Sequence, residues 1–204
     1  TVTVQAASDL ADISGITDTN IDTIDLGSAN VTATMTAAQA AKIASSAAGD
    51  AITINTLTGA TTAGTAATET FIFAGTDTSV VINTFTTGTD HVDLDAVTDA
   101  TVAGTAFVAF DNNEAVADNS ILLVNAAGAA LNAAAVQNLL NDTDVNNDGK
   151  MHLATGDEII IFNQYGIGDV NTQIIKVVGA AGDDTVSLLG TVTGDQALTF
   201  ADVI

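Results

Sequence analysis

The sequence predicts a mainly β fold, with β-sandwich or β-roll-like sheets and two short helices. Short segments alternate apolar and polar residues with a period of two, which is the side-chain pattern of a strand with one buried face. Threonine, valine and isoleucine, which favour strands, recur in these segments. Helix signals occur in two stretches, residues 36–48 and 131–141, so we expect sheets to supply most of the core.

The first half of the chain, residues 1–100, is predicted to form a β-rich domain with one helix. The helix at residues 36–48 is predicted from its ends, because Thr36 is a favourable N-cap, Gln39 completes a capping box and Gly49 follows the last position. Strands are expected on either side of it, at residues 1–4, 21–26, 31–35, 51–57, 70–74, 79–85 and 90–94.

Two features concern how these strands are arranged. The neighbouring segments 70–74 and 79–85 are separated by a short turn and are predicted to pair as a hairpin. The string D-x-[IV]-D-L occurs at residues 22–26 and again at 90–94. We interpret this repetition as a distant internal echo and not as a solenoid array.

The second half, residues 101–204, is predicted to be a second β-rich domain, or the continuation of the first in one continuous domain. Its helix, at residues 131–141, places Val136, Leu139 and Leu140 on one apolar stripe. Strands are expected at residues 106–110, 120–125, 158–162, 172–178 and 186–189.

A candidate calcium loop, residues 142–158, follows the second helix. Asp144, Asn146 and Asp148 stand at alternate positions and Gly149 follows them, which is the residue order of an EF-hand-like loop. Calcium takes about six to eight oxygen ligands, and glycine supplies the positive φ that turns the chain around the ion. The sequence therefore predicts a calcium site that also uses the carbonyl of Lys150.

The end of this loop departs from the EF-hand pattern. Thr155 occupies the twelfth position, where a bidentate glutamate is expected. Asp157 or Glu158 must supply the missing ligand, or the site is weak. The alternative is a solvated turn without calcium, because Asp, Asn and Gly are also the commonest turn residues.

Composition bounds the possible partners of the chain. Its 204 residues include 25 acids, three lysines, no arginine and no cysteine, which gives a net charge of −22. This charge argues against nucleic acid and anionic membranes as partners, and cations are its natural counterpart. The lack of cysteine excludes disulfides and thiolate zinc sites, and no apolar run approaches the roughly 20 residues of a membrane-inserted helix.

Residues 69–97 resemble a segment near the C-terminus of RTX-type bacterial proteins that leave the cell by type I secretion. The matching positions are Thr70, Phe71, Phe73, Ile82, Phe85, Gly88, Asp90, Val92, Asp93 and Leu94. Residues 157–204 are similar to the β-rich ends of such proteins, which carry the uncleaved export signal. The resemblance implies a location outside the cell or on the bacterial cell surface.

The RTX resemblance has a limit. The nonapeptide G-G-x-G-x-D-x-U-x, which binds a ladder of calcium ions in RTX proteins, is absent, so those sites are transferred to no residue here. For Asp90, a structural role at the start of a strand and calcium ligation remain alternatives. In its acidic, cysteine-free composition, rich in Ala, Thr and Val, the chain also resembles bacterial surface-layer proteins.

The sequence does not predict an enzyme. It holds two histidines, no cysteine nucleophile and no G-x-S-x-G or H-E-x-x-H motif. We expect a non-enzymatic structural subunit of an extracellular bacterial assembly, a surface layer or filament, that calcium stabilises and that assembles with identical subunits. Cell-surface polysaccharide is a further candidate partner. The alternative is a C-terminal secretion and folding module of a larger type I-secreted adhesin or hydrolase.

Overall fold

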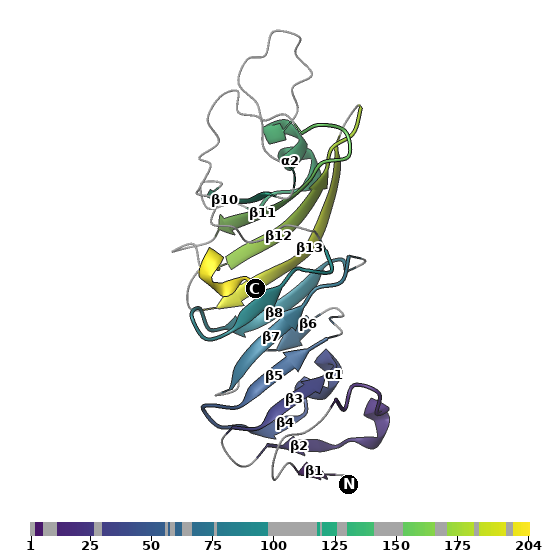
Figure 1. Ribbon diagram of the computed structural model, residues 1–204, viewed down its shortest axis with the longest axis vertical. Coiled ribbons are helices and arrows are strands. Elements are labelled where there is room, and N and C mark those ends of the chain that lie inside the picture. The colour runs from purple at the N-terminus through teal and green to yellow at the C-terminus, as the bar shows by residue number, and fades with distance from the viewer. Residues whose placement is uncertain are drawn as a thin grey trace.

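The computed structural model confirms a mainly β chain with short helices. It describes residues 3–5, 12–26, 30–55, 57, 60–62, 67–75, 77–97, 118, 120–125, 130–140, 153–165, 171–181, 184–194 and 198–204. The strands follow one another along the long axis of the molecule, with β1 at one end and the sheet that contains β10 toward the other (Figure 1).

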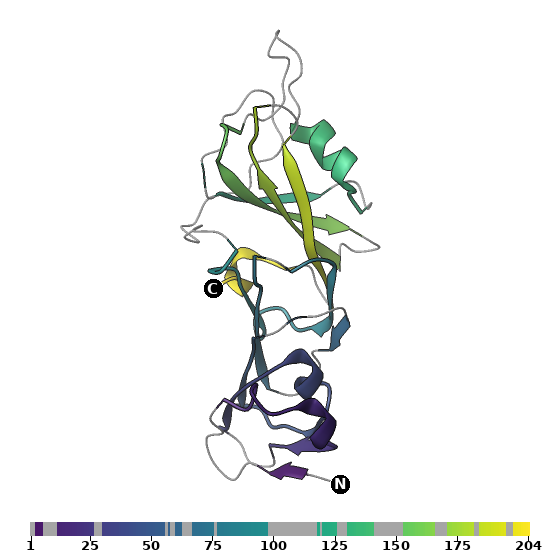
Figure 2. The ribbon, with the colours of Figure 1, turned by 90° about the vertical axis from the view of Figure 1, so that its right-hand side faces the viewer.

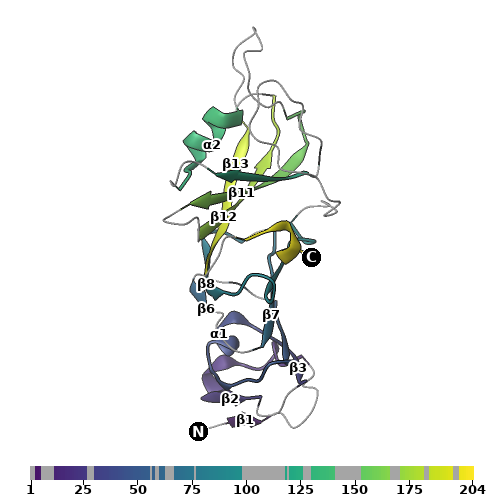
Figure 3. The same ribbon diagram turned by 90° about the vertical axis from the view of Figure 1, so that its left-hand side faces the viewer.

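The first nine strands form a stack of coils. They are β1 (Thr3–Gln5), β2 (Thr23–Asp25), β3 (Thr32–Met35), β4 (Ile43–Ser45), β5 (Ala51–Ile54), β6 (Ala60–Thr62), β7 (Thr68–Ile72), β8 (Val80–Phe85) and β9 (His91–Asp93). Four of these strands form one sheet in the order β3-β5-β7-β9. The others pair separately, as β1-β2-β4 and as β6-β8. Figure 3 shows β2, β6 and β8 along one side and β3 and β7 along the other.

All pairs within this coil stack are parallel, and successive coils use similar lengths of chain. Thr3 pairs with Thr23, Ala51 with Thr68, and Ala60 with Val81, so one coil takes roughly 20 residues, which is within the range of solenoid repeats. The interpretation of the sequence as lacking a solenoid array was therefore wrong. The predicted hairpin was also wrong, because β7 and β8 belong to different sheets.

The predicted helix at residues 36–48 is largely absent. Only α1 (Ala37–Ala40) forms, and it does carry the capping box, in which the Gln39 N–H donates to Thr36 Oγ1 over 3.2 Å. The chain then leaves the helix because Ile43 pairs with Ile24 and makes β4 a strand beside β2. Pairing with a distant strand thus outweighs the local helix signal.

The C-terminal sheet contains the longest strands. Its elements are β10 (Ser120–Asn125), α2 (Ala133–Leu140), β11 (Glu158–Tyr165), β12 (Asn171–Val178), β13 (Thr185–Gly194) and the 3₁₀ turn η2 (Phe200–Asp202); the coil stack holds one further such turn, η1 (Asp18–Asn20). β10 is parallel to β11, β11 to β13 form an antiparallel meander, and β13 pairs in parallel with β8. The helix predicted at residues 131–141 is confirmed as α2, whereas the strand predicted at 106–110 lies outside the described residues.

Two glycines of β13 allow it to approach β8. A Cβ atom on Gly194 would lie 2.0 Å from the carbonyl oxygen of Phe85, and one on Gly190 would lie 2.8 Å from that of Val80. No side chain fits at these distances, so the pairing requires glycine at both positions. The resulting six-stranded sheet, β10-β11-β12-β13-β8-β6, contains strands from both sides of the predicted domain boundary at residue 100.

One large core fills the coil stack and continues under the C-terminal sheet, where it includes Phe162 and Leu198. Phe71, Phe73 and Phe85 are at most 1% exposed, and the rings of Phe71 and Phe85 lie 6.2 Å apart between centroids. All three belong to this core. A smaller cluster, which includes Leu122, packs under α2, which covers one side of the C-terminal sheet (Figure 2).

We predict that Phe73→Ala lowers the free energy of unfolding by about 3–5 kcal/mol, because the removed ring leaves a cavity in a closed core. The ring also lies beside Gly190, so the loss extends to the contact between the coil stack and β13. The control is Ile72→Thr, at the adjacent, partly exposed position, which keeps a β-branched side chain. Chemical denaturation measures both, and equal losses for the two variants would contradict the assignment of Phe73 to the core.

Candidate calcium site and buried aspartates

The predicted calcium loop lies between a helix and a strand, as the sequence indicated. α2 ends at Leu140, and β11 begins at Glu158. Four of the predicted ligands, Asp144, Asn146, Asp148 and Lys150, lie outside the described residues. Their ligation of calcium therefore stays a prediction, and the structure bears on the two acids at the end of the loop.

The end of the loop is fixed by backbone hydrogen bonds. Gly156 N–H donates to the carbonyl of Gly179 over 2.9 Å, and Gly179 N–H donates to the carbonyl of Asp157 over 2.8 Å. Gly156 has a positive φ of 95°, and a Cβ on Gly179 would lie 2.1 Å from the carbonyl oxygen of Ala154. These contacts hold Asp157 at the end of the sheet, directly before β11.

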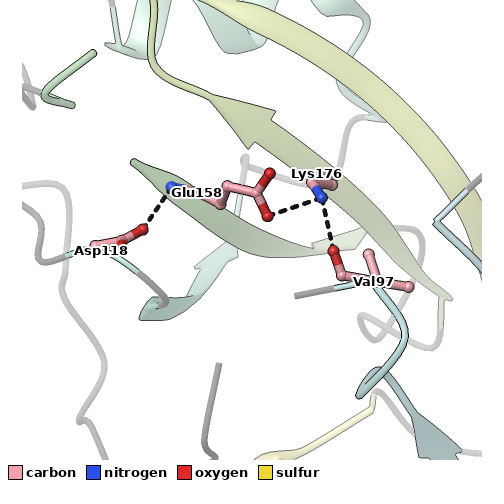
Figure 4. A network of polar contacts seen from close by, with 4 residues as sticks. All are labelled: Val97, Asp118, Glu158 and Lys176. Carbon is pink, nitrogen blue, oxygen red and sulfur yellow. Dashed lines mark hydrogen bonds and ion pairs between the residues drawn. The ribbon is translucent and has the colours of Figure 1, made fainter. Parts of the chain in front are cut away.

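Glu158 takes part in a polar network with Asp118, Lys176 and Val97 (Figure 4). Its carboxylate lies 2.8 Å from Lys176 Nζ, which also donates to the carbonyl of Val97 over 2.6 Å. The backbone N–H of Glu158 donates to Asp118 Oδ1 over 2.7 Å. Because its charge is already paired with Lys176, Glu158 is the less favourable of the two acids for binding calcium, and Asp157 is the better candidate.

Several other acids are buried and serve the backbone. Asp50 and Asp90 stand immediately before β5 and β9, and each is 1% exposed. Asp50 accepts the N–H groups of Val31 and Ala47, over 2.9 and 2.7 Å. Asp90 accepts those of Glu69 and Thr86, over 3.1 and 2.7 Å.

A third aspartate repeats this arrangement near the end of the chain. Asp202 is fully buried, and its carboxylate accepts the N–H of Gly88 over 2.6 Å and the N–H and hydroxyl of Thr199 over 2.8 and 2.7 Å. We call Asp50, Asp90 and Asp202 the strand-start aspartates. For Asp90, the described contacts support the structural role at the start of a strand, which was one of the two alternatives left open by the sequence.

The sequence contains a local signal for two of the strand-start aspartates. A residue with positive φ precedes two of them closely, Gly49 before Asp50 and Gly88 before Asp90. A glycine one or two positions before an aspartate, followed by an alternating apolar segment, marks the turn at which a new strand begins.

Within the described ranges, no group of three or more His, Cys, Asp or Glu side chains is placed to hold a metal ion. No helix in the same ranges is long and apolar enough to cross a membrane. Comparisons with protein-family models, with curated proteins and with solved structures find no match to this chain.

We predict that calcium raises the thermal stability of the chain and that Asp148→Ala abolishes most of this effect. With a Kd of about 10 µM and about 1 mM calcium, binding adds roughly 2.7 kcal/mol to the free energy of unfolding. The control is Asp95→Ala, which removes an exposed acid outside the loop. A melting temperature that chelator leaves unchanged would contradict the calcium site.

Calcium titrations of single variants distinguish the two acids at the end of the loop. Asp157→Asn should weaken calcium binding by about tenfold, or 1.4 kcal/mol, whereas Glu158→Gln should change it less because Lys176 already occupies that carboxylate. A larger effect of Glu158→Gln would show that calcium displaces Lys176.

Proposed function

We propose that this chain is a non-enzymatic structural subunit of an extracellular bacterial assembly, a surface layer or filament, that calcium stabilises and that assembles with identical copies. The observation that carries the proposal is the coil stack, in which short parallel strands follow one another along the long axis (Figure 1). In such stacks each coil contacts only its neighbours, so the stack is a quasi-one-dimensional scaffold that lengthens by one repeat per coil. A scaffold of this kind suits a subunit with a mechanical role.

Charge supports a role for calcium in the assembly. A net charge of −22 opposes contact between identical copies, and monovalent salt screens this repulsion only beyond a Debye length of about 8 Å. Bound divalent ions neutralise carboxylates at short range. Where free calcium is low the chain remains a soluble monomer, and where it is high the copies approach and associate.

The strand edges constrain which part of the chain takes part in the association. The C-terminal residues 198–204 are occupied within the fold, because Val203 bridges Val92 and Asp202 binds Gly88. Among the described strands, β4, β6 and β10 also have a single strand partner, but β1 (Thr3–Gln5) lies at the end of the stack (Figure 1). We propose the edge of β1 that does not face β2 for pairing with another copy by β-augmentation.

The alternative function is a C-terminal secretion and folding module of a larger type I-secreted adhesin or hydrolase. One observation favours it: residues 69–97, the segment that resembles RTX-type proteins, form the last coil of the stack and meet the C-terminal sheet directly. In this alternative the coil stack continues upstream, and cell-surface polysaccharide is a ligand of the larger protein.

We predict that the purified chain forms particles larger than a monomer when calcium is raised to the millimolar range, and that chelator reverses this. Static light scattering measures the mass, and electron microscopy distinguishes filaments from sheets. Magnesium at the same concentration is the control for general charge screening. A chain that stays monomeric at high concentration in millimolar calcium contradicts the subunit and leaves the secretion module as the better account.

A further inference from the structure

Residues 198–204 repeat the contact by which one coil of the stack lies on the next. Asp202 precedes Val203 as Asp50 precedes β5 and Asp90 precedes β9. In each case the carboxylate accepts the N–H of a residue three or four positions earlier, whose carbonyl accepts the N–H of the aspartate in return. In each case the other carboxylate oxygen accepts an N–H from a preceding coil. The segment is thus built as the beginning of a further coil.

This segment covers one edge of β9. Val203 forms a parallel bridge with Val92, and Ile204 N–H donates to the carbonyl of Val92 over 3.0 Å, while β7 pairs with the other edge of the strand. Val203 is 5% exposed, and Leu198 is fully buried. In the part of the chain that the structure describes, Val203 is the residue paired with this edge of β9.

The C-terminal sheet holds the other end of the segment. Leu198 N–H donates to Thr172 Oγ1, and Gln164 Nε2 donates to the carbonyl of Leu198, both over 3.0 Å. The C-terminal turn lies on the side of the molecule away from α2 (Figures 2 and 3). The segment therefore links the C-terminal sheet to the last coil of the stack.

We propose that residues 198–204 are an edge cap that prevents β9 from pairing with β9 of a second copy. An uncovered strand edge offers unpaired N–H and carbonyl groups to another strand, and two identical edges pair about a two-fold axis in antiparallel orientation. Pairing centred on Val92 places His91 of each copy opposite Asp93 of the other, and both side chains are partly exposed. This complementarity favours a second copy as the occupant.

Deleting residues 198–204 tests the proposal, with the measurement made in chelator so that it does not depend on calcium. We expect the shortened chain to sediment as a dimer under conditions in which the full chain is a monomer. A synthetic peptide of residues 198–204 should return it to a monomer, and the same peptide with Asp202→Ala should not. Dimers that persist in excess of the unaltered peptide would show that another surface is responsible.

A single substitution provides the second test in case the shortened chain does not fold. Ile204→Pro removes the N–H that donates to Val92, whereas Ile204→Ala keeps it and trims a side chain that is 51% exposed. We expect the proline variant to dimerise with an association constant at least about tenfold above that of the alanine variant. Equal association constants, or a folded shortened chain that stays monomeric, would overturn the proposal. Both results are independent of whether calcium drives assembly of the full chain.

Discussion

The parallel pairing of β8 with β13 is the contact on which the rest of the structure depends. It joins the coil stack to the C-terminal sheet, and it exists because Gly190 and Gly194 let the two backbones meet where no Cβ atom fits. The last coil is closed on both sides by the same part of the chain, since β13 covers the edge of β8 and Val203 covers that of β9. A stack of parallel strands ends in edges that promote aggregation, and at the end formed by β8 and β9 the chain supplies its own closure.

The buried aspartates show one structural role of the acidic composition. The strand-start aspartates are buried, and backbone N–H groups donate to their carboxylates, so these acids stabilise coil-to-coil contacts through hydrogen bonds. Lys176 pairs with Glu158 and binds the carbonyl of Val97, and the Lys42 amino group donates to the carbonyl of Ile21 over 2.8 Å. The two described lysines are thus engaged within the fold.

The sequence predicted most strands but not their pairing. Alternation of apolar and polar residues is a local property, so β2, β5, β9 and β12 could be located. Pairing between parallel strands about 20 residues apart produces no fixed sequence period when the coils differ in length, so it could not be predicted. Thr36 and Gln39 correctly predicted a helix start, but pairing of Ile43 with Ile24 ended the helix after one turn. Of the candidate site, the helix and strand that flank the loop could be predicted. The pairing of Glu158 with Lys176 could not, because it depends on the register of β11 against β12.

Native-state hydrogen exchange on Gly194→Ala tests most directly whether the β8–β13 pairing unites the molecule. The added methyl group has no room beside the carbonyl of Phe85, so the substitution should cost about 1–3 kcal/mol, whereas Gly15→Ala meets open space. If the pairing unites the two parts, amides of β8 and of β12 lose protection together in Gly194→Ala and keep it in Gly15→Ala. Loss of protection confined to β13, with the coil stack unchanged, would contradict this account.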